Sequence, residues 1–186
     1  MKQEFTISLF SESHIGILSR ITLILTRRQI NIESITASES AVPGVQMLTM
    51  VVRTTPEMVE KVARQIEKLV DVLKVFVHTS SEIIYQELAL YKVTTRGLMS
   101  GSMSADIVRK YHARILEVTS EYTVVEKSGT RAEIKEMLKL LEPCGVLQFV
   151  SSGRIAVTRQ VKELNSYLKE MDEALRNRQE TVELYS

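Results

Sequence analysis

The sequence has few of the residues that build disulfide frameworks, flexible linkers or membrane spans. Its single cysteine, Cys144, excludes a disulfide within the chain and agrees with a reducing cytoplasm. Seven glycines, three prolines and no tryptophan leave no low-complexity or linker-like segment. No apolar run approaches the length of a transmembrane helix, and the N-terminus lacks the long apolar segment of a secretion signal. We therefore expect a cytoplasmic protein without a membrane partner.

An excess of charge of one sign is also absent, because 24 basic residues stand against 23 acidic ones and the net charge is +1. The basic pairs Arg27-Arg28 and Arg109-Lys110 are isolated, so no nucleic-acid partner is indicated. A hydrophobic content of 44% can supply a core, and 186 residues fit one large domain or two small ones.

Residues that bind metals or catalyse reactions are not grouped in the sequence. No two of His14, His78 and His112 lie three or four residues apart, and Cys144 has no neighbouring base. Segment 95–102 contains two glycines but lacks the Gly-Lys-Ser/Thr ending of a phosphate-binding loop, and we expect a mobile loop there. Four further carboxylates fall on predicted polar faces or turns: Glu60, Glu67, Asp71 and Glu82. We expect no catalytic site, metal or cofactor in this chain.

The first half of the chain follows the order strand, helix, strand, strand, helix, strand. Alternating or β-rich apolar residues predict strands at 5–10, 30–38, 45–53 and 73–77. A helical stripe at 17–25 predicts the first helix, with Ser11 or Ser13 as its cap. Thr55 and Pro56 suit the cap and first position of the second helix, which continues to about Leu69.

The same βαββαβ order recurs in the second half. Strands are predicted at 88–95, 113–119, 122–127 and 146–151, and helices at 104–111 and from Gly129-Thr130 to Leu141. Pro143-Cys144-Gly145 ends the second of these helices. The fold class is therefore α+β, with two ferredoxin-like modules in tandem. We place the domains at 1–80 and 81–159, followed by a helical extension at 160–186.

That extension carries apolar residues at spacings of three and four, and we expect an amphipathic helix. Its apolar positions are Val161, Leu164, Leu168, Met171 and Leu175. Such a helix packs either on its own domain or on a partner.

The turn between the first strand and the first helix is the most informative segment. Backbone N–H groups at a helix N-terminus, where the macrodipole is positive, can hold a small anion without a catalytic side chain. Gly16 suits such a turn because glycine accepts positive φ and leaves room for a ligand, although an ordinary loop glycine is the alternative. His14 is either a ligand contact or a surface residue. Asn31 either contributes an amide or simply begins the next strand.

Residues 12–20 (Glu-Ser-His-Ile-Gly-Ile-Leu-Ser-Arg) and 31–36 (Asn-Ile-Glu-Ser-Ile-Thr) resemble the opening of an ACT domain. More narrowly, they resemble the small, regulatory subunit of acetolactate synthase (acetohydroxyacid synthase). Segments 68–75, 87–93 and 143–159 are similar to further stretches of that family, in the same order along the chain.

The resemblance implies a non-catalytic partner of a large subunit that carries thiamine diphosphate, Mg²⁺ and FAD and condenses pyruvate with pyruvate or 2-oxobutyrate. The small subunit would activate that enzyme and confer feedback inhibition by a branched-chain amino acid, typically valine. The resemblance also implies that the effector lies between two protomers of a homodimer. The predicted topology agrees with this, since the second strand is an edge that invites pairing with another copy. The effector-binding residues implied are Ser13, His14, Ile15, Gly16 and Ile17 of one protomer, with Asn31 and Ile32 of the other.

Two positions depart from the family pattern. The family usually has Asn where this chain has Ser13, and Gly where it has Gln29.

The effector side chain is expected to be received by four apolar residues: Leu9, Ile15, Ile17 and Ile32. A stand-alone ACT amino-acid sensor acting on another enzyme or regulator is the alternative function.

Overall fold

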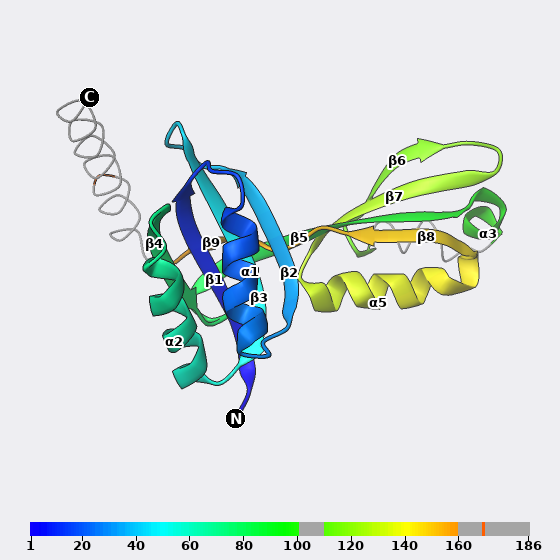
Figure 1. Ribbon diagram of the computed structural model, residues 1–186. Coiled ribbons are helices and arrows are strands. Elements are labelled where there is room, and N and C mark those ends of the chain that lie inside the picture. Colours follow the sequence, from blue (N-terminus) through cyan, green and yellow to red (C-terminus); the bar gives the residue numbers. More distant parts are fainter. Residues whose placement is uncertain (101–109, 160–168, 170–186) are drawn as a thin grey trace. The chain divides into compact units, whose positions relative to one another are not determined.

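The structure is a computed structural model that describes residues 1–100, 110–159 and 169 (Figure 1). Two compact units divide the chain. The first comprises Met1–Ile84 and Ala156–Ser186, and the second comprises Tyr85–Ile155. The helix predicted at 160–186 lies outside the described residues, apart from Lys169.

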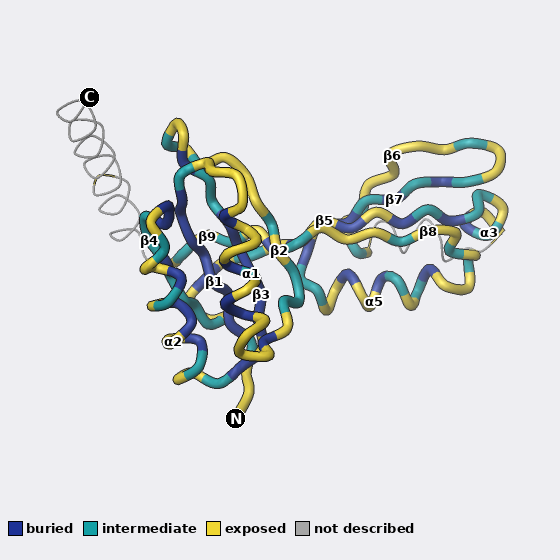
Figure 2. Tube along the Cα trace, viewed as in Figure 1, coloured by how far each residue is buried: buried dark blue, intermediate teal, exposed yellow. Residues whose placement is uncertain are grey.

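The first unit is an antiparallel sheet with two helices on one face. Its elements are β1 (Gln3–Glu12), α1 (Ile17–Arg27), β2 (Ile32–Glu39), β3 (Val45–Thr54), α2 (Pro56–Glu67) and β4 (Val72–His78). The strand order β2-β3-β1-β4 confirms the predicted βαββαβ topology and leaves β2 at an edge of this sheet. The central strand β1 is almost wholly buried, whereas the edge strand β2 has no fully buried residue (Figure 2).

The core of the first unit lies between the sheet and the helices. Phe5, Ile7 and Leu9 alternate along β1 and pack against α1 and α2. The predicted alternation of Leu73, Val75 and Val77 is wrong for Leu73, which packs with Phe10 in a second cluster on the other face. A register shift between Phe10 and Ser11, where β1 pairs with β4, accounts for the change of face.

The second unit repeats this architecture. Its elements are β5 (Ile83–Thr94), which begins in the first unit, α3 (Thr95–Met99), β6 (Arg114–Val118), β7 (Tyr122–Gly129), α5 (Arg131–Leu141), the 3-10 turn η1 (Glu142–Cys144) and β8 (Val146–Ser151). The strand order is β6-β7-β5-β8, and α5 covers one face through Ile134, Met137 and Leu141. A further strand, β9 (Ile155–Thr158), belongs to the first unit from Ala156 on, pairs with β5 and was not predicted.

Threonine caps begin three of the described helices. Thr55 precedes α2 and accepts a hydrogen bond from the N–H of Met58, as predicted. Thr130 precedes α5 and forms a capping box with Glu133, whose carboxylate accepts the Thr130 N–H at 2.7 Å. Thr94 caps α3 by accepting a hydrogen bond from the N–H of Gly97 at 3.1 Å, without a capping box.

Segment 95–102 was predicted to be a loop, and this is wrong for Thr95–Met99, which form α3. Gly97 brings this helix against η1, because a Cβ atom at Gly97 would lie 2.0 Å from the carbonyl oxygen of Cys144. The Thr94 hydroxyl also donates to that carbonyl at 2.8 Å. The helix predicted at 104–111 falls mostly outside the described residues.

No described helix is both long enough and apolar enough to cross a membrane.

Candidate functional site

The turn between β1 and α1 is exposed and built around a left-handed glycine. The N–H of Ser13 donates to the carbonyl of Gly44 at 3.2 Å, and that of His14 to the carbonyl of Glu12 at 2.9 Å. Gly16 has φ +89°, a conformation that L side chains rarely adopt, and a Cβ atom there would meet nothing within 4 Å. The positive φ suggested for Gly16 is therefore confirmed, and a side chain at this position would enter open space.

The N-terminus of α1 has no side-chain cap, in contrast to the threonine-capped α2, α3 and α5. The prediction that Ser11 or Ser13 caps α1 is wrong. The helix begins at Ile17, so the capping position is Gly16, and Ser11 still belongs to β1. The first intrahelical bond runs from the N–H of Arg20 to the carbonyl of Gly16 at 3.2 Å. The N–H groups of the first turn before it have no acceptor within the helix, and that turn carries no acidic residue.

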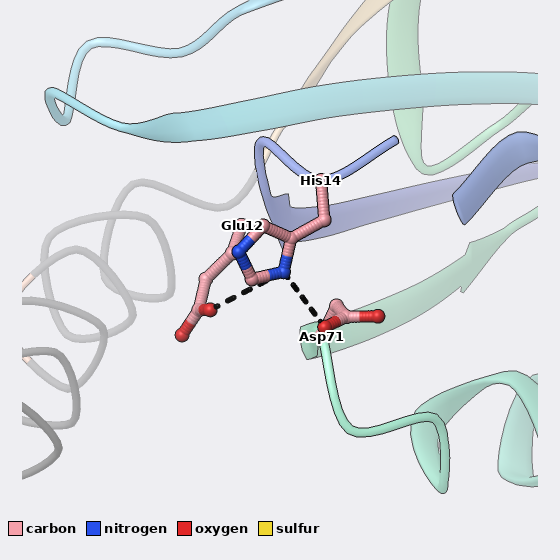
Figure 3. A group of neighbouring side chains, drawn as sticks. All are labelled: Glu12, His14 and Asp71. Atoms are coloured by element: carbon pink, nitrogen blue, oxygen red, sulfur yellow. Dashed lines mark hydrogen bonds and ion pairs between the residues drawn. The ribbon is translucent and has the colours of Figure 1, made fainter. Parts of the chain in front are cut away.

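Asp71, which lies between α2 and β4, forms hydrogen bonds to residues on both sides of this turn and within it (Figure 3). Its carbonyl accepts the N–H of Glu12 at 2.9 Å. One carboxylate oxygen lies 2.8 Å from Nδ1 of His14, and the other accepts a hydrogen bond from the guanidinium of Arg20. Asp71 is only 8% exposed, whereas His14 and Arg20 are exposed. A single buried carboxylate therefore links the turn and the second turn of α1.

These contacts favour the ionised carboxylate. The hydrogen bond from His14 is the largest cause, the hydrogen bond and charge of Arg20 add to it, and partial burial opposes it, so the pKa of Asp71 lies below its ordinary value. A group with a lowered folded-state pKa stabilises the fold above its unfolded pKa. The contribution of Asp71 is therefore present at neutral pH and is lost as the pH falls through the folded-state pKa.

Glu12, His14 and Asp71 also place three metal-ligand atoms within 4.8 Å of one another among the described residues (Figure 3). Arg20 argues against a cation at this point, because its guanidinium already contacts Asp71 and would repel a divalent ion. The cluster is best described as a hydrogen-bond network that fixes the turn.

The site residues suggested by the sequence fall into two groups that one chain does not bring together. The exposed turn holds Ser13, His14, Ile15 and Gly16, followed by the buried Ile17. Ile32 begins β2, and Asn31 immediately precedes it, at the other end of the sheet, since the register runs from Ile32 through Val52 to Phe5. The turn follows Glu12, at the far end of the same strand and roughly 20 Å away.

The apolar residues suggested for the effector side chain differ in their surroundings. Leu9 and Ile17 belong to the core between the sheet and the helices. Ile15 is fully exposed in the turn, and Ile32 is partly buried at the start of β2. Within one chain, only the last two present surface to a ligand.

Arg20 and Asp71 belong to the hydrogen-bond network of the candidate site, and sequence reasoning missed them. Asp71 was expected on a polar face or turn, and 57 residues separate it from His14. Only the antiparallel pairing of β4 with β1 brings the two together.

Two family models match the chain in succession. One, described as an AHAS small subunit-like ACT domain, matches residues 7–74. The other, described as the small subunit of acetolactate synthase, matches residues 86–160.

Curated relatives and a solved structure agree with these matches. An acetolactate synthase small subunit of Bacillus subtilis (strain 168) is 34% identical over 168 residues, covering 88% of this chain and 94% of the relative. Another, from Mycobacterium leprae, is 32% identical over 154 residues, covering 83% of this chain and 90% of the relative. The crystal structure of the acetolactate synthase small subunit from Thermotoga maritima matches with a TM-score of 0.77 and 26% identity, covering 85% of this chain and 98% of that one.

Proposed function

Because this chain belongs to the family of acetolactate synthase small subunits, we propose that it activates the catalytic subunit of that enzyme and makes it sensitive to feedback by valine. The proposed binding of valine is supported by the N-terminus of α1, which has no side-chain cap and has Gly16 at its capping position. The catalytic chemistry, and the thiamine diphosphate, Mg²⁺ and FAD that serve it, belong to the partner subunit. This chain contributes binding and regulation.

The turn suits the carboxylate of an amino acid. The N–H groups of the first turn of α1 have no acceptor within the helix and lie at the positive end of the helix dipole. A carboxylate placed there accepts these hydrogen bonds and gains from the dipole without a basic side chain. Gly16 leaves the approach open.

The second half of the site would come from another copy of the chain. In the sheet of the first unit, β2 is an edge strand that can pair with a second β2. In an antiparallel, two-fold pairing, the start of one β2 lies beside the end of the other. That end is Glu39, which aligns with Gln46 and Ser11 immediately before the turn. Asn31 of one protomer would thus reach the turn of its partner.

The effector's side chain would be held where these two segments meet. Ile15 of the turn and Ile32 of the partner's β2 are the apolar residues with surface to offer. A ligand that contacts both protomers binds the paired arrangement better than any other. Such a preference is sufficient for feedback, since allosteric coupling is typically about 1–3 kcal/mol.

A stand-alone amino-acid sensor is the alternative. It would account for the first unit, which carries the ACT match at 7–74. It would leave the second unit without a role, although residues 86–160 match the small subunit of acetolactate synthase. The continuous match across both units favours the regulatory subunit.

Co-purification with an acetolactate synthase catalytic subunit of the same organism tests the proposal. We expect the tagged chain to retain that subunit, to raise its rate of acetolactate formation and to make the rate fall when valine is added. A different thiamine-diphosphate-dependent enzyme serves as the control bait. Absence of both retention and stimulation would refute the assignment. Valine binding without either would instead support the stand-alone sensor.

A further inference from the structure

We propose that Asp71 is the positioning residue of the effector turn, which sets the affinity for the effector without contacting it. This inference takes the identity of the ligand, valine, from the proposed function. The structural role of Asp71 is independent of that function and can be measured in the absence of any ligand.

Asp71 is suited to this role because it joins segments that are far apart in the sequence. It lies between α2 and β4, more than 50 residues after the turn, yet it contacts three groups around that turn. Its carbonyl accepts the N–H of Glu12, where β1 ends. One of its carboxylate oxygens forms a hydrogen bond with His14 in the turn, and the other accepts a hydrogen bond from Arg20 in α1. Because it is nearly buried, the carboxylate is held in one orientation.

Asp71 could also act on the effector through its negative charge. The electrostatic role and the positioning role predict opposite changes in valine affinity when that charge is removed. A negative charge beside an anion site weakens anion binding, so an electrostatic role alone predicts that removing the charge tightens valine binding. A positioning role predicts the reverse, because the turn amides lose their fixed arrangement. Arg20 and His14 partly offset the charge of Asp71, while Glu12, with its carboxylate 3.8 Å from His14, adds another negative group. We expect the geometric effect to dominate.

The affinity test uses Asp71→Asn, which keeps the shape of the side chain. Titration calorimetry should show valine binding at least ten-fold weaker than in the parent. Glu67→Gln is the matched control, because Glu67 ends α2 and forms an ion pair with Lys74 at 3.1 Å, away from the contacts of Asp71. The affinity of this variant should stay within two-fold of the parent's. Unchanged or tighter binding in Asp71→Asn would overturn the proposal.

A double-mutant cycle tests whether Asp71 affects valine affinity through its contact with Arg20. In an Arg20→Gln background, Asp71→Asn should weaken binding less than it does in the parent, because one of its partners is already gone. If Asp71→Asn does not fold, Arg20→Gln removes an exposed side-chain partner of Asp71 that is not among the proposed effector contacts. This variant should also bind valine more weakly, and parent-like binding would contradict the proposal.

Backbone ¹⁵N relaxation provides the ligand-free measurement. In the parent, residues 13–16 should have order parameters close to those of rigid backbone, about 0.85. In Asp71→Asn they should fall toward values below about 0.6, while the amides of the second unit remain unchanged. Order parameters that do not change would refute the positioning role even if valine binds. A parent chain that does not bind valine would refute the proposed effector, and the relaxation result would still decide the role of Asp71.

Discussion

A Gly16→Asp variant is expected to fold and to lose measurable valine binding, with affinity reduced by at least about 100-fold, or roughly 2.7 kcal/mol. Folding should survive because a Cβ atom at Gly16 meets nothing within 4 Å. The cost to the fold is the strain of a side chain at φ +89°, about 1 kcal/mol. Binding should fail because the new carboxylate would lie where the effector's carboxylate is proposed to bind, and the two would repel each other.

Gly16→Asn is the matched control for charge. Asparagine has the size of aspartate and adopts the left-handed region more readily than most residues. The difference between the two variants in titration calorimetry therefore measures the effect of the negative charge. If Gly16→Asp binds valine within three-fold of the parent, the turn is not the carboxylate site.

A Gly97→Ala variant is expected to destabilise the second unit by about 3 kcal/mol, at the upper end of the usual cost of overpacking. Its Cβ atom would lie 2.0 Å from the Cys144 carbonyl oxygen and 2.6 Å from the Thr94 hydroxyl oxygen. The carbonyl belongs to the backbone between η1 and β8 and cannot rotate away as a side chain would. Either α3 or this turn must shift.

The sign of this effect makes the test decisive. Gly97 does not have positive φ, and Gly→Ala inside a helix ordinarily stabilises by about 0.5–1 kcal/mol. Urea unfolding followed by circular dichroism should nevertheless show a loss. Gly44→Ala is the control, since Gly44 has φ +78° and open space around it, so only strain of about 1 kcal/mol is expected. A neutral or stabilising result for Gly97→Ala would show that α3 does not pack against η1.

Gly97 also shows which features can be predicted from the sequence and which cannot. The strand alternation, the helical stripes and the Thr55 and Thr130 caps depend on neighbouring residues, so local pattern predicts both βαββαβ units. Gly97 has its role through a contact with Cys144, 47 positions along the chain, which no local pattern reveals. The prediction of a loop there rested on its two glycines, and packing accounts for the one at Gly97.

Gln29 shows a departure from a family pattern that the structure explains. It follows α1 with φ +54°, in the left-handed region where glycine is the least strained residue. The family's usual glycine therefore matches the backbone, and this chain carries a modest strain instead. Sequence alone gave the departure but not its physical meaning.

The site itself was predictable only in part. The turn could be recognised because Gly16 and the following helix are adjacent in the sequence. Asp71 could not, because its contacts with His14 and Arg20 depend on the pairing of β4 with β1. The contribution proposed for Asn31 would also require another chain, which a single sequence does not specify.

The central claim is that one effector site is built from two chains, and complementation between two defective variants tests it most directly. Gly16→Asp damages the turn and Asn31→Ala damages the other half, so neither homodimer should bind valine. In a mixed dimer, the intact turn of the Asn31→Ala chain meets the intact Asn31 of the Gly16→Asp chain. Half of the randomly paired dimers are mixed and each holds one intact site, so calorimetry should recover about one quarter of the parent's sites. If the parent binds valine and the mixture does not, the site is not shared between chains.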